Sequence, residues 1–293
     1  MSSASTRRAA MATATVRNGR HMTLGAYGLR LSGDAPRSAL LASVAENAPE
    51  IVITRRVGTI EVTNTVDEEA ATVPLLDGGG LELSRKARSA WLTTRQAITD
   101  DELAHPYLAP IAAVHSHWLG RAAFHAGAIV VAGRAWGVIG ERQAGKSTLL
   151  AAIASEGGVV LSDDLLVMEG GNVFCGPRTL DLREEAARWF GGTRSLGMAG
   201  ARERWRLDLG PAPEAAPLAG WIVPGWSADI MVERQPGAAA AHHIAPARSV
   251  TGLAIEPQVF LAAAAHPAVA FNRPKDLTQV AAGVHRLLDE LMA

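Results

Sequence analysis

Cysteine is almost absent from this chain of 293 residues. Cys175 is the only one, so no disulfide can form within the chain. An excess of basic charge is also missing, because the formal net charge is −1, whereas dedicated nucleic-acid-binding domains are usually basic. No apolar stretch reaches the length of a membrane span. We therefore expect a cytoplasmic protein whose partners include neither nucleic acid nor a membrane.

The N-terminal residues have no apolar run of the kind that a secretory signal carries, and residues 1–21 are predicted to be a disordered tail. From Leu24 onward, short alternating segments separated by turn residues indicate strands, with a helix expected within residues 36–47. We interpret residues 22–98 as a small mixed α+β domain, with substrate capture, assembly into a homo-oligomer and scaffolding as its alternative roles. Residues 99–293 are predicted to form the second domain. The expected strands lie at 27–34, 50–64 (two strands), 71–76 and 80–84.

The segment GERQAGKST matches the phosphate-loop pattern G-x-x-x-x-G-K-[ST]. Its glycines let backbone N–H groups approach phosphate oxygens, Lys146 can reach the terminal phosphates, and Ser147 offers a hydroxyl to Mg²⁺. An apolar run at 135–140 precedes it and helical spacing over 147–157 follows, which is the strand, loop and helix order that the pattern requires. The cofactors are therefore predicted to be ATP and Mg²⁺. The predicted nucleotide-binding residues are Gly140, Glu141, Arg142, Gln143, Ala144, Gly145, Lys146, Ser147 and Thr148.

His125 begins a segment with two apolar runs around Ala132 and Gly133, which predicts a β-hairpin. An antiparallel pairing centred near Gly133 places His125 roughly opposite Glu141, at the mouth of the phosphate loop. A lone histidine is usually structural, so a structural and a catalytic role both stay open.

A pair of carboxylates follows the next predicted strand. The apolar run 159–161 leads directly into Asp163 and Asp164. Ligands of open α/β sheets bind at the carboxyl ends of strands, and this strand should run parallel to the strand before the loop and near it. One carboxylate could hold the metal ion while the other accepts a proton from an attacking hydroxyl. The alternative is a capping pair in a turn.

The order of histidine, hairpin, GxxxxGKS, helix and strand ending in Asp-Asp resembles the HPr kinase/phosphorylase family. It is most similar to the short HPr-kinase-like proteins associated with ribosomally made peptides such as lasso peptides, and PEP carboxykinases share a related core. The resemblance implies an α/β fold with a P-loop core of this type. It implies that His125 and Asp163 act in proton transfer, that Ser147 and Asp164 hold Mg²⁺, and that Lys146 binds phosphates. The Gly-rich signature that HPr kinases carry after the Asp pair is not recognisable, which argues against HPr itself as the substrate.

Arginines near a transferring phosphoryl group would stabilise its charge. Arg178 and Arg183 flank Asp181 in GPRTLDLR, so both are candidate phosphate or substrate ligands, with a strand that has solvated ends as the alternative. The arginines at 194, 202, 204 and 206 form a local basic region, which we interpret as a solvated charged loop, with a surface that faces an acidic peptide or phosphates as the alternative.

The leading hypothesis is a Mg-ATP-dependent serine kinase that phosphorylates a Ser or Thr hydroxyl of a peptide or small protein. The alternatives are a P-loop ATPase or nucleotide switch that acts on a protein partner, and a small-molecule kinase. The aspartate pair together with His125 favours transfer to a hydroxyl, because a switch needs only a positioned water.

Overall fold

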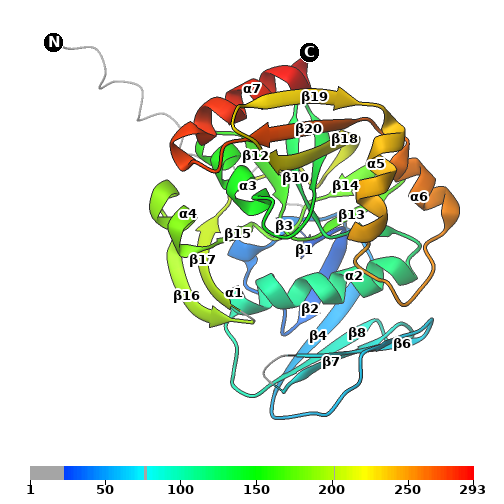
Figure 1. Cartoon of the computed structure of the whole chain (residues 1–293). Coiled ribbons are helices and arrows are strands. Elements are labelled where there is room, and N and C mark those ends of the chain that lie inside the picture. Colours follow the sequence, from blue (N-terminus) through cyan, green and yellow to red (C-terminus); the bar gives the residue numbers. More distant parts are fainter. Residues whose placement is uncertain (1–22, 76–77, 201) are drawn as a thin grey trace, which may run out of the picture.

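The computed structural model describes residues 23–75, 78–200 and 202–293, so the predicted tail at 1–21 lies outside the described residues. The fold is mixed α/β (Figure 1). Within the described residues the strands form three sheets: an N-terminal sheet, a central sheet and a small three-stranded sheet.

The N-terminal sheet has eight strands in the order β3-β1-β2-β4-β8-β7-β6-β5. Only the β2–β4 and β4–β8 pairs are parallel. Helix α2 packs against this sheet, because Leu108 and Ile111 share one hydrophobic core with Ile53 and Leu92. The bounds are β1 Leu24–Ala26, β2 Leu29–Gly33, β3 Ala42–Ser43, β4 Glu50–Val57, β5 Thr65–Val66, β6 Ala70–Pro74, β7 Gly80–Ser84, β8 Ser89–Thr94 and α2 Leu108–Trp118.

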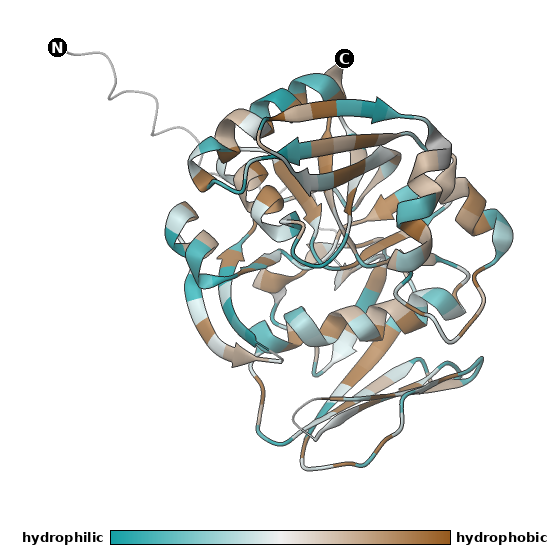
Figure 2. Ribbon diagram, viewed as in Figure 1, coloured by the Kyte–Doolittle hydropathy of each residue, from teal (hydrophilic) through white to brown (hydrophobic). Residues whose placement is uncertain are grey.

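The central sheet has nine strands, and its longest, β18, pairs in parallel with both β11 and β20. Strand β10 lies between β11 and β12 and is antiparallel to both. Figure 2 shows hydrophobic residues concentrated on these strands, with more polar residues on the outer strand β19. The bounds are β9 Ala122–Phe124, β10 Ala126–Val131, β11 Arg134–Ile139, β12 Val159–Ser162, β13 Leu166–Glu169, β14 Asn172–Phe174, β18 Ala215–Trp226, β19 Met231–Gln235 and β20 Ala268–Arg273.

Helices cover both faces of the central sheet. Leu150 of α3 and Leu287 of α7 pack with Phe271 in one hydrophobic core, whereas Ile244 of α5 and Ala263 of α6 pack with Trp221 in another. The bounds are α3 Lys146–Ser155, α5 Gly237–Ile244, α6 Pro257–Ala264 and α7 Val280–Met292. Across residues 23–75, 78–200 and 202–293, no helix has the length and apolar character needed to cross a membrane.

The three-stranded sheet has the order β15-β17-β16 and lies beside α3 and α4 (Figure 1). Its strands are antiparallel, and β17 carries Arg202, Arg204 and Arg206. The bounds are β15 Thr179–Leu182, α4 Glu184–Phe190, β16 Arg194–Ala199 and β17 Arg202–Asp208.

Two local predictions for the N-terminal region are wrong. Residues 36–47 contain a 3₁₀ turn, Ser38–Leu40, and strand β3 in place of a helix. The reason is tertiary: β3 finds a partner in β1, with Leu24 opposite Ser43. Residues 58–64 form no strand, so the expected second strand of the 50–64 segment is absent, and β5 begins only at Thr65.

Candidate active site

The phosphate-loop segment connects β11 to α3, as the sequence predicts. Gly145 has φ +79°, and a Cβ atom there would lie 2.5 Å from Nη2 of Arg273, so only glycine fits. Arg273 donates to the Gly145 carbonyl (3.0 Å) and Trp226 Nε1 donates to the Gln143 carbonyl (3.2 Å). The ends of β20 and β18 therefore hold the loop in place, and the first turn of α3 leaves N–H groups without helical partners.

A cavity of about 480 Å³ opens at this loop, a size typical of small-molecule sites. Its lining includes Lys146, Ser147 and Asp164, together with the beginnings of α4 and β17 and the segment after β20. Lys146 Nζ donates to the carbonyls of Gly140 (2.8 Å) and Glu141 (3.1 Å). Burial lowers the pKa of Lys146, against the attraction of the two aspartates.

His125 also lines this cavity, because the predicted hairpin is present. Ala126 pairs with Ile139, so extending the register by one position sets His125 opposite Gly140, one residue from the predicted partner. Burial lowers the pKa of His125. Strand β12, which follows α3, is expected from the sequence to run parallel to β11 and near it. It does run in the same direction as β11, but β10 lies between the two strands.

The two aspartates occupy different surroundings at the end of β12. Asp163 is 6% exposed, and its Oδ1 lies 3.4 Å from Oγ of Ser147, while its Oδ2 has no hydrogen-bond partner among the described residues. Asp164 adopts φ +60°, a conformation that aspartate tolerates better than most residues, and it lines the cavity. Asp163 thus contacts Ser147 directly, and no hydrogen bond joins Ser147 to Asp164, the other member of the expected metal-ligand pair, among the described residues.

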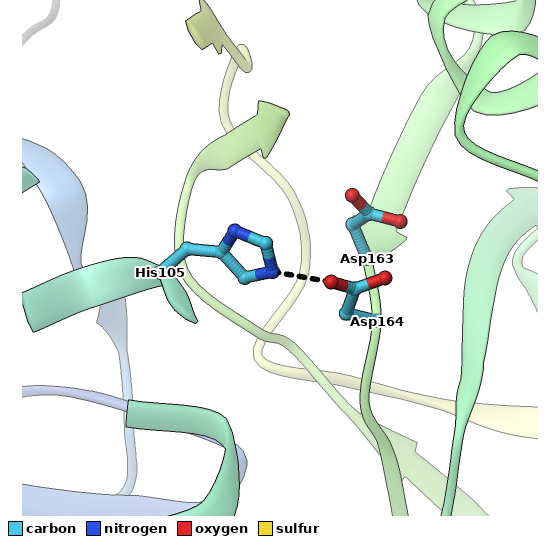
Figure 3. A group of neighbouring side chains, drawn as sticks. All are labelled: His105, Asp163 and Asp164. Atoms are coloured by element: carbon cyan, nitrogen blue, oxygen red, sulfur yellow. Dashed lines mark hydrogen bonds and ion pairs between the residues drawn. The ribbon is translucent and has the colours of Figure 1, made fainter. Parts of the chain in front are cut away.

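A residue that the sequence did not single out completes the cluster. His105 Nε2 lies 2.5 Å from Oδ2 of Asp164 (Figure 3). Thr99 and Glu102 form a capping box at the start of α1, Asp100–Glu102, and the chain then reaches His105, whose backbone is extended (φ −158°, ψ 123°). Extended backbone is what the residue before a proline favours, and Pro106 follows.

Asp181 of β15 fixes the other side of this imidazole. Its Oδ2 lies 2.7 Å from Nδ1 of His105 and accepts from Arg204 Nη1 and Arg206 Nη2, each at 3.2 Å. Its Oδ1 accepts from Nε of Arg206, and Nη2 of Arg206 also donates to the carbonyl of His105 (3.0 Å). Arg206 has no exposed side-chain surface, so the interpretation of this segment as solvated is wrong for Arg204 and Arg206.

The charges in this cluster shift its pKa values strongly. Burial lowers the pKa of His105, but Asp164 and Asp181 outweigh burial and raise it to about 9, so the ring is an imidazolium at neutral pH. Burial would raise the pKa of Asp164, yet His105 holds it well below the usual range. For Asp163, burial and the charge of Asp164 raise the pKa to about 7.

The donor set suits a divalent cation. One carboxylate oxygen each of Asp163 and Asp164 lie within 4.8 Å of each other, and the Ser147 hydroxyl is next to Asp163. His105 belongs to the same cluster, but as an imidazolium bonded to Asp164 and Asp181 it has no free lone pair for a metal. Hard cations such as Mg²⁺ prefer carboxylate and hydroxyl oxygens. A buried carboxylate oxygen without a partner is costly, so the unpartnered Oδ2 of Asp163 also fits a cation ligand.

The two arginines predicted as phosphate or substrate ligands have different positions. Arg178 is buried and donates to the carbonyls of Val160 (2.9 Å) and Gly210 (2.6 Å), away from the cavity lining, so we correct its prediction to a structural role. Arg183 lines the cavity.

Sequence signals for the missed residues did exist. An arginine at every second position, 202, 204 and 206, places three guanidinium groups on one face of a strand, which requires acidic partners if that face is buried. For His105, the only sequence signal was Pro106, because the residue before a proline favours an extended backbone.

We predict that Asp181→Asn lowers the free energy of unfolding by about 3–5 kcal/mol, because it leaves buried arginines without their counter-charge. The matched control is Asp208→Asn. Asp208 also pairs with an arginine (Arg194, 2.6 Å), but its side chain is 63% exposed, and such a pair contributes less than about 1 kcal/mol. Urea unfolding of both variants measures the difference. Equal losses would contradict the importance of the buried cluster.

Comparisons with known proteins add little to this geometry. The sequence matches no known family model, and no curated protein matches it. Among solved structures, the HPr(Ser) kinase/phosphatase from Coxiella burnetii aligns with 57% of this chain and 98% of its own, at 14% identity and a TM-score of 0.27. A likeness this distant carries no argument about function.

Proposed function

We propose that this protein is a Mg-ATP-dependent kinase that phosphorylates a Ser or Thr hydroxyl of a peptide or small protein. The observation that carries the proposal is the meeting of two groups in one cavity. Lys146 and Ser147 of the phosphate loop line it together with Asp164, a carboxylate held in place by a buried imidazolium. Phosphoryl transfer needs phosphate positioning, charge stabilisation and an acceptor for the hydroxyl proton.

The distances suggest a division of labour between the aspartates that reverses the one implied by the family resemblance. Asp163 and Ser147 are the better pair of metal ligands, because they are 3.4 Å apart and Asp163 is otherwise unpartnered. When bound, Mg²⁺ would neutralise charge on the β- and γ-phosphate oxygens. Asp164 is placed to accept the hydroxyl proton, because it lines the cavity and its Oδ1 lies outside the hydrogen bond to His105 (Figure 3). The low pKa of Asp164 makes it a weak base in the resting site, so the proton moves only as the acceptor oxygen bonds to phosphorus and becomes acidic.

In this mechanism Lys146 and the loop N–H groups bind the β- and γ-phosphates. The acceptor oxygen forms a bond to the γ-phosphorus as the bond to the β,γ-bridging oxygen breaks. The hydroxyl proton passes to Asp164, and ADP leaves. His105 is a positioning residue, because it contacts Asp164 and Asp181 and fixes the orientation of the carboxylate.

The proposal is tested by incubating the protein with Mg-ATP and a library of Ser- and Thr-containing peptides, with small hydroxyl compounds in a second set. Mass spectrometry of the acceptors and measurement of ADP release are the two readouts. We expect phosphopeptides to form in step with ADP. ADP release without any phosphorylated acceptor would replace the kinase by an ATPase or switch, and phosphorylation of small hydroxyl compounds alone would indicate a small-molecule kinase.

A further inference from the structure

Three arginines alternate along one face of β17, and their environments change in order along the strand. Arg206 is fully buried and binds Asp181 and Asp101. Arg204 is buried and binds Asp181 and the carbonyl of Ala199. Arg202 is only partly buried, and its side chain has no hydrogen bond or ion pair among the described residues. The row therefore ends in an arginine whose charge no carboxylate of those residues neutralises.

A second unpaired arginine lies beside this row. Leu182 of β15 pairs with Trp205 of β17, so continuing the register sets Arg183 next to Arg204. Arg183 is exposed and, in the part of the chain that the structure describes, has no carboxylate partner. The neighbouring Glu184 instead pairs with Arg188 (2.6 Å). Two segments, the end of β15 and the start of β17, thus bring positive charge to the same place.

Both unpaired arginines line the cavity that contains the phosphate loop. Arg202 and Arg204 lie two positions apart on one face of β17, so their like charges are close, and the charge of Arg202 adds to burial in lowering the pKa of Arg204. Two acidic residues of the lining, Asp181 and Glu185, each lie two positions from Arg183 in the chain. Asp181 is bound to other partners, and no ion pair joins Glu185 to Arg183 across the described ranges. This wall of the cavity therefore holds a surplus of positive charge.

Other cations in the same cavity are available to the nucleotide phosphates, so Arg183 and Arg202 are free for a different ligand. Lys146 lies in the phosphate loop, and Arg142 and Arg273 line the cavity next to it. Arginine binds carboxylate and phosphate groups through a planar fork of donors, and unpaired guanidinium groups facing a cavity are suited to such a ligand.

We propose that Arg183 and Arg202 bind an anionic group of the acceptor, a carboxylate or a phosphate, and that the enzyme selects acceptors with this charge close to the reacting hydroxyl. This inference rests on the proposed kinase function and names the substrate class of the same site. The arginines would hold the acceptor while Asp164, on the same cavity, accepts the hydroxyl proton.

The test compares three peptides that share one central serine and differ in the neighbouring residues: alanines, aspartates, or one phosphoserine. A charge-assisted hydrogen bond contributes about 1.5–3 kcal/mol, or about 10–150-fold in affinity. We therefore expect the parent protein to favour at least one acidic peptide by about 10-fold or more in kcat/KM. The aspartate and phosphoserine peptides distinguish the two sources of charge.

The variants Arg183→Ala and Arg202→Ala should each lose most of this preference, through a higher KM for the acidic peptide, while affinity for Mg-ATP stays within about twofold. Arg188→Ala is the matched control, because Arg188 lies on the helix that follows Arg183, is exposed, and does not line the cavity. It should keep the preference. Weaker Mg-ATP binding in the two variants with an unchanged peptide preference would overturn the inference and assign the arginines to the nucleotide.

Calorimetric binding of the same peptides, in the presence of Mg²⁺ and a non-hydrolysable ATP analogue, separates this inference from the proposed function. Equal phosphorylation of neutral and acidic peptides would overturn the anion site and leave the kinase standing. Arginine-dependent binding of an acidic peptide that is never phosphorylated would support the anion site while the kinase proposal fails. Absence of any such binding would overturn the anion site.

Discussion

Replacing Lys146 with alanine is expected to lower ATP turnover by about 10²–10³-fold or more, because it removes a preorganised donor from the transferring phosphate. The thermal stability of the protein should not change. Lys146 Nζ contacts only the carbonyls of Gly140 and Glu141 among the described residues, and the side chain has no place in a hydrophobic core. Steady-state ADP release, calorimetry of Mg-ATP binding and thermal unfolding of the variant measure the three quantities separately.

The control for this variant is Lys86→Ala, since Lys86 is an exposed lysine of the N-terminal sheet region, remote in sequence from the loop. It should turn over ATP at the parent rate. Unchanged affinity and unchanged turnover in Lys146→Ala would remove the assignment of this segment as a phosphate loop, and with it the proposed function.

The second large effect is expected at Asp164. Asp164→Asn should lower phosphoryl transfer by about 10²–10⁴-fold, the range for loss of a general base, with Mg-ATP binding retained. Asparagine has nearly the same shape and keeps an oxygen that can accept from His105, and Asp181 still pairs with the imidazolium, so we expect the fold to be retained. Single-turnover phosphorylation of a peptide acceptor by the variant measures the effect.

Asp163→Asn is the matched comparison, because Asp163 is the residue next to Ser147. We expect this variant to need a higher Mg²⁺ concentration for half-maximal activity and to recover part of its activity at saturating metal. Metal titrations of both variants distinguish the roles. The opposite pattern, with metal dependence shifted by Asp164→Asn, would restore the order of roles implied by the family resemblance.

The sequence by itself determined the local framework of the site. Turn glycines, apolar runs and helical spacing are short-range signals, so the hairpin before the loop, the strand–loop–helix unit and the aspartate pair at the end of β12 were all predictable. Strand β12 was also placed in the right direction. The intervening β10 was not foreseen, because strand order depends on pairing across the whole sheet.

Only the tertiary structure decided which side chains act together. His105 lies 76 residues from Asp181 and 99 from Arg204 in the sequence. No local sequence pattern predicts contacts between residues so far apart in the chain. Arg202 and Arg206 belong to the same row of alternating arginines, yet Arg206 is fully buried and Arg202 is only partly buried. The sequence pattern alone does not distinguish them. Adjacent in sequence, Asp163 contacts Ser147 and Asp164 contacts His105, and Asp164 has the positive φ of +60°. A sequence pattern reports the periodicity of one segment. The site forms where several segments meet, and the packing of those segments determines which side chains contact one another.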